Sequence, residues 1–557
     1  MINNYKEKYY NWLNNKSLDV MSKDLLLKMS ESEIEDSFYK NLSFGTAGMR
    51  GVIGVGTNRF NIYTLRKANY GYAKFLKSLK KEDIKIVIAR DNRLYGKEFV
   101  EECVKTLSKF NIKCYVFDKI TPTPVLSYAI RYLKADGGIV ITASHNPKDY
   151  NGYKVYDNTG CQLTPKYANI VEKEVLNAPD YFDIEVNDYE YCLKNNLVLR
   201  INDDLLRSYI EDVKSITINN DIDKSNFSLT ISPLHGTGGE ISCKLLDDLN
   251  YNYIKVNEQF DNDPSFPTLI NPNPEEESAL LLSIEYAKKY NCDLCLATDP
   301  DSDRIGVAVK FNDGEYKLLN GNQIGIILLY YLTNNKDLKN NYFIDTIVSS
   351  RLTRKIALAN KMNVITTYTG FKFISQQVEH LILNNKKFAF AYEESYGYLL
   401  KDIIRDKDAF QPLVLLTEIA CFYKNKGINL INVLDDIYNK YGYFKEELLS
   451  FTFSGVDGQT KMNNLIYKLK NDDIKFETYL ISSKKDYSLN DLIINNINLY
   501  KSDIIEYNFK EDIYAIFRPS GTEPKFKVYI GAKGENLDDV YSKINSLKKE
   551  VLKLFDK

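Results

Sequence analysis

The sequence is short of the features that define several common classes of protein. Its 557 residues include only three histidines and eight cysteines, and 73 basic residues nearly balance 75 acidic ones for a net charge of −2. Such a balance leaves no overall positive field for binding nucleic acid or an anionic membrane. We therefore expect small-molecule ligands, with no nucleic-acid partner and no membrane partner.

Long apolar runs are also missing. Residues 1–13 lack the apolar core of a secretory signal, and no later run approaches the roughly 20 apolar residues of a membrane span. The cysteines are sparse and scattered, which favours reduced thiols over a disulfide framework. Cys292 and Cys295 form a CxxC without a second pair for zinc, so two buried strand thiols are expected there. A cytoplasmic enzyme fits these absences best.

A repeated pattern of short strand and polar loop organises the chain, and a helix-period segment is expected after each loop. The five strand-like runs that precede chemically interesting loops are residues 84–88, 139–141, 229–231, 294–297 and 388–391. Strands that alternate with helices predict parallel or mixed sheets, and ligands of such sheets bind beyond the carboxyl ends of the strands. The polar loops are thus expected to form the active site.

The length predicts several domains, because single hydrophobic cores stop growing near about 250–300 residues. Composition and periodicity predict three α/β domains and a smaller C-terminal α+β domain that ends in an amphipathic helix. The expected ranges are residues 1–200, 201–318, 319–442 and 443–557.

Ser144 follows the apolar run Ile139–Ile141, so a buried strand is expected to present its hydroxyl in a polar turn. A hydrolase nucleophile has glycines two residues to either side, but Thr142 and Asn146 occupy those positions. A Ser-His-Asp triad is also disfavoured, because the histidines lie next to Ser144 or far from it along the chain, at His145, His235 and His380. We interpret Ser144 as a phosphoryl carrier rather than an acyl carrier.

Three alternate carboxylates, Asp299, Asp301 and Asp303, follow the run 294–297. An extended loop turns alternate side chains to one side, where their oxygens can converge on a divalent cation. An EF-hand would need Gly and Glu where Arg304 and Lys310 stand. Magnesium, with an open position for a phosphate oxygen, is therefore preferred over calcium, and a solvated acidic turn is the alternative.

Four other loops carry groups suited to a sugar phosphate. The segment 518–522, Arg-Pro-Ser-Gly-Thr, can clamp a phosphate with its guanidinium, hydroxyls and backbone N–H groups. The glycine-rich segment 44–51 can aim Arg50 at an anion, and it lacks both the P-loop and the dinucleotide-binding pattern, which argues against nucleoside triphosphate hydrolysis. Segments 369–372 and 393–397 offer the carboxylate, hydroxyl and ammonium groups that sugar hydroxyls require. Each loop alone also fits an ordinary turn or helix cap.

Taken together and in their order along the chain, from segment 44–51 through the serine and aspartate loops to 393–395 and 518–522, the loops resemble those of the α-D-phosphohexomutase superfamily, over residues 40–530. Segments 369–372 and 393–395 are most similar to its phosphoglucomutase and phosphopentomutase branch. The resemblance implies three α/β domains around a central cleft and a smaller phosphate-binding domain. It further implies an isomerase, an intramolecular phosphotransferase that interconverts glucose 1-phosphate and glucose 6-phosphate through a phosphoserine enzyme, with Mg²⁺ and with glucose 1,6-bisphosphate as intermediate and activator.

The same resemblance implies a role for each site residue. Ser144 would carry the phosphoryl group, and the three aspartates would bind Mg²⁺ together with its phosphate. His145 and Lys154 would serve proton transfer and substrate contact, with Arg50 near the phosphoserine. The residues that would contact the sugar phosphate are Arg304, Thr369, Gly370, Lys372, Glu393, Ser395, Arg518, Ser520, Gly521 and Thr522.

These residues do not determine which sugar phosphate is the substrate. A phosphopentomutase, a phosphomannomutase or a sugar-bisphosphate synthase would use the same phosphoryl-transfer residues. From another class, the chain could be a non-catalytic sensor of sugar phosphates, but a pure binder has no use for a phosphoryl-accepting serine.

Overall fold

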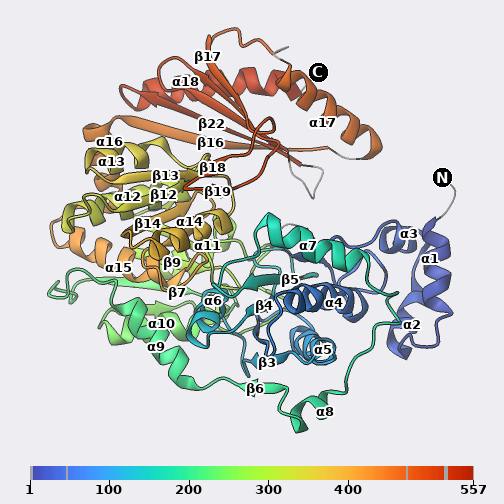
Figure 1. Ribbon diagram of the computed structural model, residues 1–557. Helices are drawn as coiled ribbons and strands as arrows, with labels where there is room; N and C mark the ends of the chain where they lie inside the picture. Colours follow the sequence, from blue (N-terminus) through green and yellow to red (C-terminus); the bar gives the residue numbers. More distant parts are fainter. Residues whose placement is uncertain (1–3, 46–47, 454, 472–473, 520–524, 556–557) are drawn as a thin grey trace. The chain divides into compact units, whose positions relative to one another are not determined.

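The computed structural model describes residues 4–45, 48–453, 455–471, 474–519 and 525–555 (Figure 1). Its chain forms two compact units. The first comprises Met1–Asn320 and Ser395–Lys426, and the second comprises Gly321–Glu394 and Gly427–Lys557. Within the described residues, no helix is long and apolar enough to span a membrane.

A six-stranded mixed sheet forms the first part of the first unit. In spatial order its strands are β1 (Met49–Val52), β5 (Tyr150–Asp157), β4 (Gly137–Ile141), β2 (Lys85–Arg90), β3 (Lys113–Val116) and β6 (Val198–Arg200). Strands β4, β2, β3 and β6 are parallel, whereas β5 runs antiparallel to its neighbours β1 and β4. The parallel strands thus place the loops after β2 and β4 at one edge of the sheet.

Helices cover both faces of this sheet because its strands are apolar on both sides. The helices are α4 (Ile62–Ser78), α5 (Gly96–Ser108), α6 (Thr123–Tyr132), α7 (Pro165–Leu176) and α8 (Tyr189–Lys194). Ile86, Ile88, Ile139 and Ile141 share a buried core with side chains of α4, α5 and α7. The alternate residues Val87 and Val140 are equally buried, and α6 packs against β2 and β4 (Figure 1).

A helical segment, α1 (Asn4–Leu13), α2 (Val20–Lys28) and α3 (Glu31–Phe38), precedes β1. Its core surrounds Trp12, the only tryptophan of the chain, which is packed edge-on against Phe38 and Tyr63. Asp19 caps α2, and Ser30 and Glu33 form a capping box at the start of α3. Because Tyr63 belongs to α4, the contact between Trp12 and Tyr63 packs the segment against that helix.

A second, five-stranded sheet follows in the first unit. Its strands, in order, are β11 (Tyr316–Leu319), β10 (Ile305–Lys310), β9 (Leu294–Thr298), β7 (Ser228–Ser232) and β8 (Asn252–Lys255). Strands β9, β7 and β8 are parallel, and β10 pairs antiparallel with β9 and β11. The remaining elements of this unit are α9 (Asp203–Lys214), α10 (Gly239–Asp248), the 3-10 helix η1 (Asn257–Gln259), α11 (Glu277–Tyr290), β15 (Gly397–Leu399) and α15 (Phe410–Lys424).

The second unit contains a third and a fourth sheet. The third has the parallel strands β13 (Asn363–Thr367), β12 (Tyr342–Thr346) and β14 (Phe388–Glu393), and its helices are α12 (Gly321–Asn335), α13 (Arg351–Ala359), α14 (Phe371–Leu383) and α16 (Leu430–Tyr441). The fourth is antiparallel and contains β16 (Tyr443–Thr452), β22 (Lys525–Gly534), β21 (Tyr514–Pro519), β20 (Ile505–Phe509) and β17 (Ile481–Asp486).

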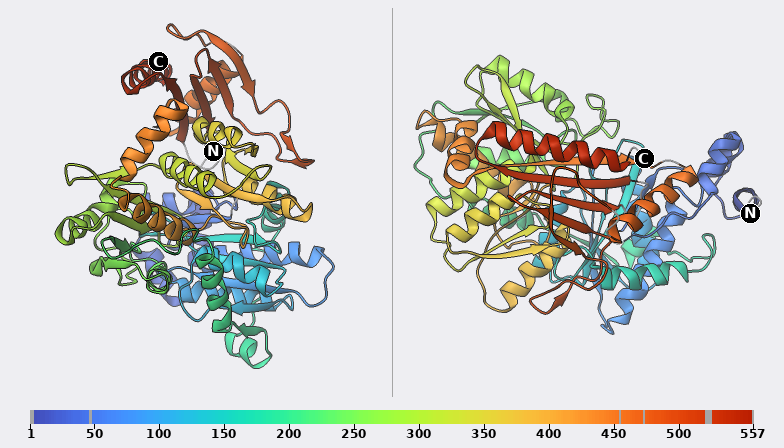
Figure 2. Two further views of the ribbon diagram at one scale, coloured as in Figure 1. Left: turned by 90° about the vertical axis from the view of Figure 1, so that its left-hand side faces the viewer. Right: turned by 90° about the horizontal axis from the view of Figure 1, so that it is seen from above.

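One face of the fourth sheet is covered by helices and the other by side chains of the third α/β part. Ala515 and Phe517 share a core with α17 (Gly455–Lys470) and α18 (Leu537–Phe555), and Figure 2 shows α18 lying over the strands. The alternate residues Tyr514 and Ile516 face a second core that includes Tyr368 and Phe373. A small hairpin of β18 (Ile493–Ile494) and β19 (Ile497–Asn498) completes this unit.

Most of the sequence expectations for the fold are confirmed, including the mixed sheets, the α+β end of the chain, the terminal helix and the buried Cys292 and Cys295. The expectation of a helix after every loop is wrong at three places. Only β2 and β7 lead into helices, whereas β4, β9 and β14 are followed by the strands β5, β10 and β15. The apolar residues of β10, such as Ile305, Val307 and Val309, recur at every second position, which is the period of a strand.

Candidate functional site

Ser144 lies in the loop after β4 and is almost completely buried. Its backbone has a left-handed φ of 52°, which is uncommon for a residue other than glycine. The hydroxyl Oγ donates to Asp299 Oδ2 at 2.8 Å and lies 3.2 Å from His145 Nδ1. The structure therefore brings the predicted serine into direct contact with the aspartate loop, 155 residues further along the chain.

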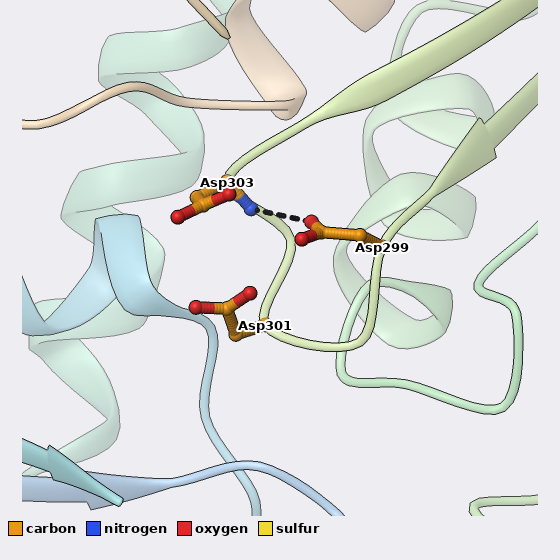
Figure 3. A group of neighbouring side chains, drawn as sticks. All are labelled: Asp299, Asp301 and Asp303. Atoms are coloured by element: carbon orange, nitrogen blue, oxygen red, sulfur yellow. Dashed lines mark hydrogen bonds between the residues drawn. The ribbon is translucent and has the colours of Figure 1, made fainter. Parts of the chain in front are cut away.

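Asp299, Asp301 and Asp303 lie in the tight connection between β9 and β10, and all three are buried (Figure 3). One carboxylate oxygen from each lies within 4.8 Å of the others. The backbone N–H of Asp303 donates to Asp299 Oδ1 at 3.0 Å, which fixes the turn. Asp301 Oδ1 and Asp303 Oδ1 are buried without a hydrogen-bond donor in the described structure. Oxygens that converge and lack donors fit a divalent cation.

Two lysines offset part of this negative charge. Lys154 extends from β5, and its Nζ lies 2.6 Å from Asp301 Oδ2 and 3.2 Å from Asp303 Oδ2. Lys407 Nζ lies 3.2 Å from Asp303 Oδ2. Lys154 was predicted only through the family resemblance. Lys407 was not predicted, because the segment around Lys407 matches none of the motifs considered above.

Burial and neighbouring charges shift the pKa values of these carboxyl groups in different directions. Burial, reinforced by the other two carboxylates, raises the pKa of Asp299 well above its usual range. Burial also opposes ionisation of Asp303, but Lys407 and Lys154 outweigh it and hold the pKa of Asp303 low. The pKa of Lys154 is raised, because Asp301 and Asp303 outweigh the effect of its burial. The site is therefore a cluster of ion pairs with an excess of acid.

His145 is held neutral by its surroundings. Burial lowers the pKa of its imidazole well below the usual range, and the positive charges of Arg304 and Arg50 lower it further. A neutral imidazole carries its proton on one ring nitrogen only, so Nδ1, 3.2 Å from Ser144 Oγ, donates to that oxygen or accepts from it according to the tautomer.

Two arginines predicted from the sequence border this cluster. Arg50 Nη1, on β1, donates to Asn146 Oδ1 at 3.1 Å, and the Arg50 side chain is exposed. Arg304 forms an ion pair with Glu275, and its Nε lies 3.8 Å from Asp303 Oδ1. Both guanidinium groups thus lie beside loops that contain the serine or the aspartates.

Neighbouring loops hold the serine and aspartate loops through contacts between residues far apart in the sequence, most of which were not predicted. Thr123, at the start of α6, donates from both its backbone N–H and its Oγ1 to Asp301, each at 2.8 Å. Thr237 donates to Pro300 O through both N and Oγ1 at 2.9 Å. The segment 89–93 follows the strand-like run 84–88, and its Arg93 donates to the backbone of the serine loop.

His235, in the loop after β7, has a partner at each ring nitrogen. Its Nδ1 lies 2.9 Å from Asp261 O, and its Nε2 lies 2.9 Å from Thr268 Oγ1. Its carbonyl accepts a hydrogen bond from Asn92 Nδ2 at 2.8 Å, which joins the loop after β7 to the loop after β2. His380, predicted to be a helix residue, lies in α14.

The other residues predicted to contact the sugar phosphate belong to the second unit, apart from Ser395, or fall outside the described residues. Gly370 has a φ of 112° and precedes α14, which contains Lys372 in its first turn, and Thr369 follows β13. Glu393 and Arg518 were expected in loops, but Glu393 is the last residue of β14 and Arg518 the second-last residue of β21, since both runs continue in extended conformation. Ser395 lies in the turn after β14. Ser520, Gly521 and Thr522 fall outside the described residues.

A second acidic group lies in the second unit. Burial, together with the negative charge of Glu393, raises the pKa of Glu394 to about 7, and the positive charges of Arg518 and Lys527 partly oppose this shift. The end of β14 and the strands β21 and β22 of the fourth sheet are thus electrostatically coupled in this unit.

Models of a known protein family match the three α/β parts of the chain. Models described as Phosphoglucomutase/phosphomannomutase, alpha/beta/alpha domains I, II and III, match residues 41–181, 207–312 and 320–441 in order. The chain belongs to the phosphoglucomutase/phosphomannomutase family. This assignment confirms the resemblance to phosphohexomutases drawn from the loops, and it makes the chain an isomerase of that class.

The family's relatives include proteins named phosphoglucomutase. One from Staphylococcus saprophyticus is 34% identical over 542 residues, which cover 95% of this chain and 97% of that one. One from Staphylococcus aureus is 36% identical over 542 residues, 95% of this chain and 96% of its own. Among solved structures, Paramecium parafusin, titled a phosphoglucomutase, aligns with a TM-score of 0.70 at 17% identity, covering 93% of this chain and 95% of that chain.

The aspartate cluster predicts a divalent-cation site that is measurable without substrate. Mn²⁺ or Mg²⁺ is expected to raise the thermal midpoint of the protein, because a cation relieves repulsion among the buried carboxylates. Asp301→Asn should weaken Mn²⁺ binding, measured by calorimetry, by at least about tenfold, since affinity depends on the number of charged ligands. Asp313→Asn, an exposed aspartate after β10, is the control and should bind as the wild type does. Equal affinity in both variants would contradict the site.

Proposed function

We propose that the chain interconverts glucose 1-phosphate and glucose 6-phosphate, with Ser144 carrying the phosphoryl group. The observation that carries this proposal is the 2.8 Å hydrogen bond from Ser144 Oγ to Asp299 Oδ2. If Ser144 is phosphorylated, a phosphate oxygen beside the buried carboxylates can complete a cation site. This arrangement gives the serine a role as the phosphoryl carrier. The relatives named phosphoglucomutase support glucose as the sugar.

The residues that would hold Mg²⁺ are Asp299, Asp301 and Asp303, together with a phosphate oxygen on Ser144. When bound, the cation supplies positive charge to the phosphoryl oxygens during transfer. In the described structure, Asp301 Oδ1 and Asp303 Oδ1 are buried and have no hydrogen-bond donor, and this feature supports the assignment.

The proposed reaction has two phosphoryl transfers. PhosphoSer144 gives its phosphoryl group to the 6-hydroxyl of glucose 1-phosphate, so the Ser144 Oγ–P bond breaks as an O6–P bond forms, and glucose 1,6-bisphosphate results. The bisphosphate then reorients, and its C1 phosphoryl returns to Ser144, which releases glucose 6-phosphate. The proton lost by the sugar hydroxyl in the first transfer is regained by the sugar in the second.

Residues around Ser144 have separate parts in these transfers. Lys154 and His145 lie within reach of the aspartate cluster and of Ser144 Oγ, respectively, and we assign them to proton transfer and substrate contact. Arg304 and Arg50 would offset the charge of the transferring group. Holding the bisphosphate in place would keep the two reacting groups close and exclude water, which favours transfer over hydrolysis.

Residues of the second unit and Ser395 would bind the rest of the substrate. Glu393 and Ser395 would hold sugar hydroxyls, which both donate and accept hydrogen bonds. The segment 369–372 would contribute Thr369, Gly370 and Lys372. Arg518 with Ser520, Gly521 and Thr522 would grip the phosphate that is not being transferred.

Replacement of Ser144 tests the carrier. Ser144→Ala should reduce conversion of glucose 1-phosphate to background in an assay coupled to oxidation of glucose 6-phosphate, because no group remains to carry the phosphoryl. Ser265→Ala, an exposed serine of the first unit, serves as control and should retain wild-type turnover. The thermal midpoint of both variants should remain near that of the wild type. Turnover above a trace in Ser144→Ala would refute the carrier role.

A panel of sugar 1-phosphates tests the substrate. Glucose 1-phosphate should be used with a kcat/KM at least about tenfold above those of mannose, ribose and deoxyribose 1-phosphates, since one lost hydrogen bond to a charged group is worth about 1.5–3 kcal/mol. The measurement is initial rate with catalytic glucose 1,6-bisphosphate present. Higher activity with a pentose phosphate or with mannose 1-phosphate would show that this sugar phosphate, and not glucose 1-phosphate, is the substrate. No turnover of any of them would favour a binding protein.

A further inference from the structure

Arg93 is a buried arginine whose guanidinium contacts the backbone of the serine loop four times. Its Nη1 donates to Pro147 O at 2.7 Å and to Tyr150 O at 2.8 Å. Its Nη2 donates to Ser144 O at 2.6 Å and to Asn146 O at 2.5 Å. The four hydrogens of the two terminal nitrogens are therefore all directed at carbonyls of one loop.

Asp91 connects this guanidinium to the other side of Ser144. Its Oδ1 accepts from the backbone N–H of Arg93 at 2.9 Å, and its Oδ2 lies 3.4 Å from Arg93 Nε. The same Oδ2 accepts from Thr142 Oγ1 at 2.5 Å, and Thr142 Oγ1 in turn accepts from the backbone N–H of Ser144 at 2.8 Å. Both peptide groups of Ser144 are thus held, the N–H through Thr142 and the carbonyl by Arg93.

The backbone of Ser144 needs such support. A left-handed conformation at 52° costs free energy for a residue with a Cβ, so the loop would relax without contacts that oppose it. This conformation places Oγ against Asp299 Oδ2. All four residues of the network are buried, with Arg93 the most exposed at 2%.

We propose that Arg93 and Asp91 are positioning residues for phosphoryl transfer, which fix the Ser144 backbone so that its hydroxyl and phosphate face the aspartate cluster. The inference rests on the proposed function of Ser144 as carrier. Neither residue is among those assigned to the substrate or the cation, and both act through the serine loop.

Only arginine fits this position. A lysine carries its charge on one atom with three donors, and it cannot reach carbonyls spread over the residues from Ser144 to Tyr150. The ring of Phe266, 5.3 Å from the guanidinium carbon, and the Asp91 carboxylate provide the remaining surroundings of the buried charge. Arg93→Lys therefore retains the charge and the ion pair but loses the fork that holds the loop.

The test compares Arg93→Lys and Asp91→Asn with a matched control, Arg66→Lys. Arg66 pairs with Glu102 at 2.5 Å between α4 and α5, in the same α/β part but away from the serine loop. Each protein is incubated with glucose 1,6-bisphosphate labelled with radioactive phosphate, and the rate of Ser144 labelling, the kcat and the KM are measured. Amide hydrogen exchange is followed in the peptide that spans residues 142–151.

Positioning predicts that both site variants label Ser144 about 10- to 100-fold more slowly and lose kcat by a similar factor, because small misplacements of reacting groups have effects of this size. Their KM should stay within about threefold of the wild type, since substrate binding groups are untouched. Exchange should rise in peptide 142–151 and nowhere else. The control should match the wild type in labelling rate, KM and exchange of this peptide.

Each other result overturns one specific claim. If the variants melt at lower temperature but label at the wild-type rate per folded molecule, the two residues only stabilise the fold. Should Arg93→Lys fail to fold, Asp91→Asn decides the question by the same criteria. If the wild type takes up no label on Ser144, the proposed function fails, and unchanged exchange of peptide 142–151 in Arg93→Lys then also refutes positioning of the loop.

Discussion

The site depends on the concentration of negative charge at one buried point. Asp299, Asp301 and Asp303 lie together inside the protein, where isolated carboxylates are costly, and a phosphate on Ser144 would add to them. Lys154 and Lys407 offset part of this charge, and the carboxylate oxygens without donors leave room for a cation to offset more. Much of the surrounding structure can be understood as a means of holding these charges at fixed distances.

The ends of the strands keep the distances between these charged groups fixed. The loops after β2 and β4 leave neighbouring parallel strands, and the N–H of Asp91 donates to Ile141 O at 3.1 Å, which ties the two ends together. The loops after β7 and β9 are tied in the same way through Thr237 and Pro300. Thr123 and Asn92 then join the first sheet's loops to those of the second. The hydroxyl and the carboxylates thereby lie in short loops that are tied to rigid strands, as a phosphoryl carrier beside a cation requires.

The sequence was sufficient for the parts whose chemistry is concentrated in a short segment. Ser144 and the aspartates could be recognised because an apolar run leads directly into each polar loop, and the family could be recognised from several such loops in order. Lys407, Thr123 and Arg93 could not be assigned in this way. Each acts through tertiary contacts to residues at least 50 positions away, and no local periodicity reports such contacts. The strands β5, β10 and β15 were not predicted, because a polar loop at the end of a strand can lead into a helix or into another strand.

The central claim is that phosphoserine 144 and a cation on the aspartates share one site. Phosphorus NMR of the phosphorylated protein tests it most directly, because bound Mn²⁺ broadens a phosphorus resonance strongly only when the two are close. We expect the phosphoserine resonance to be sharp with Mg²⁺ and to broaden beyond detection when Mn²⁺ occupies the aspartate site. A resonance that stays sharp in the Mn²⁺-saturated protein would contradict the account.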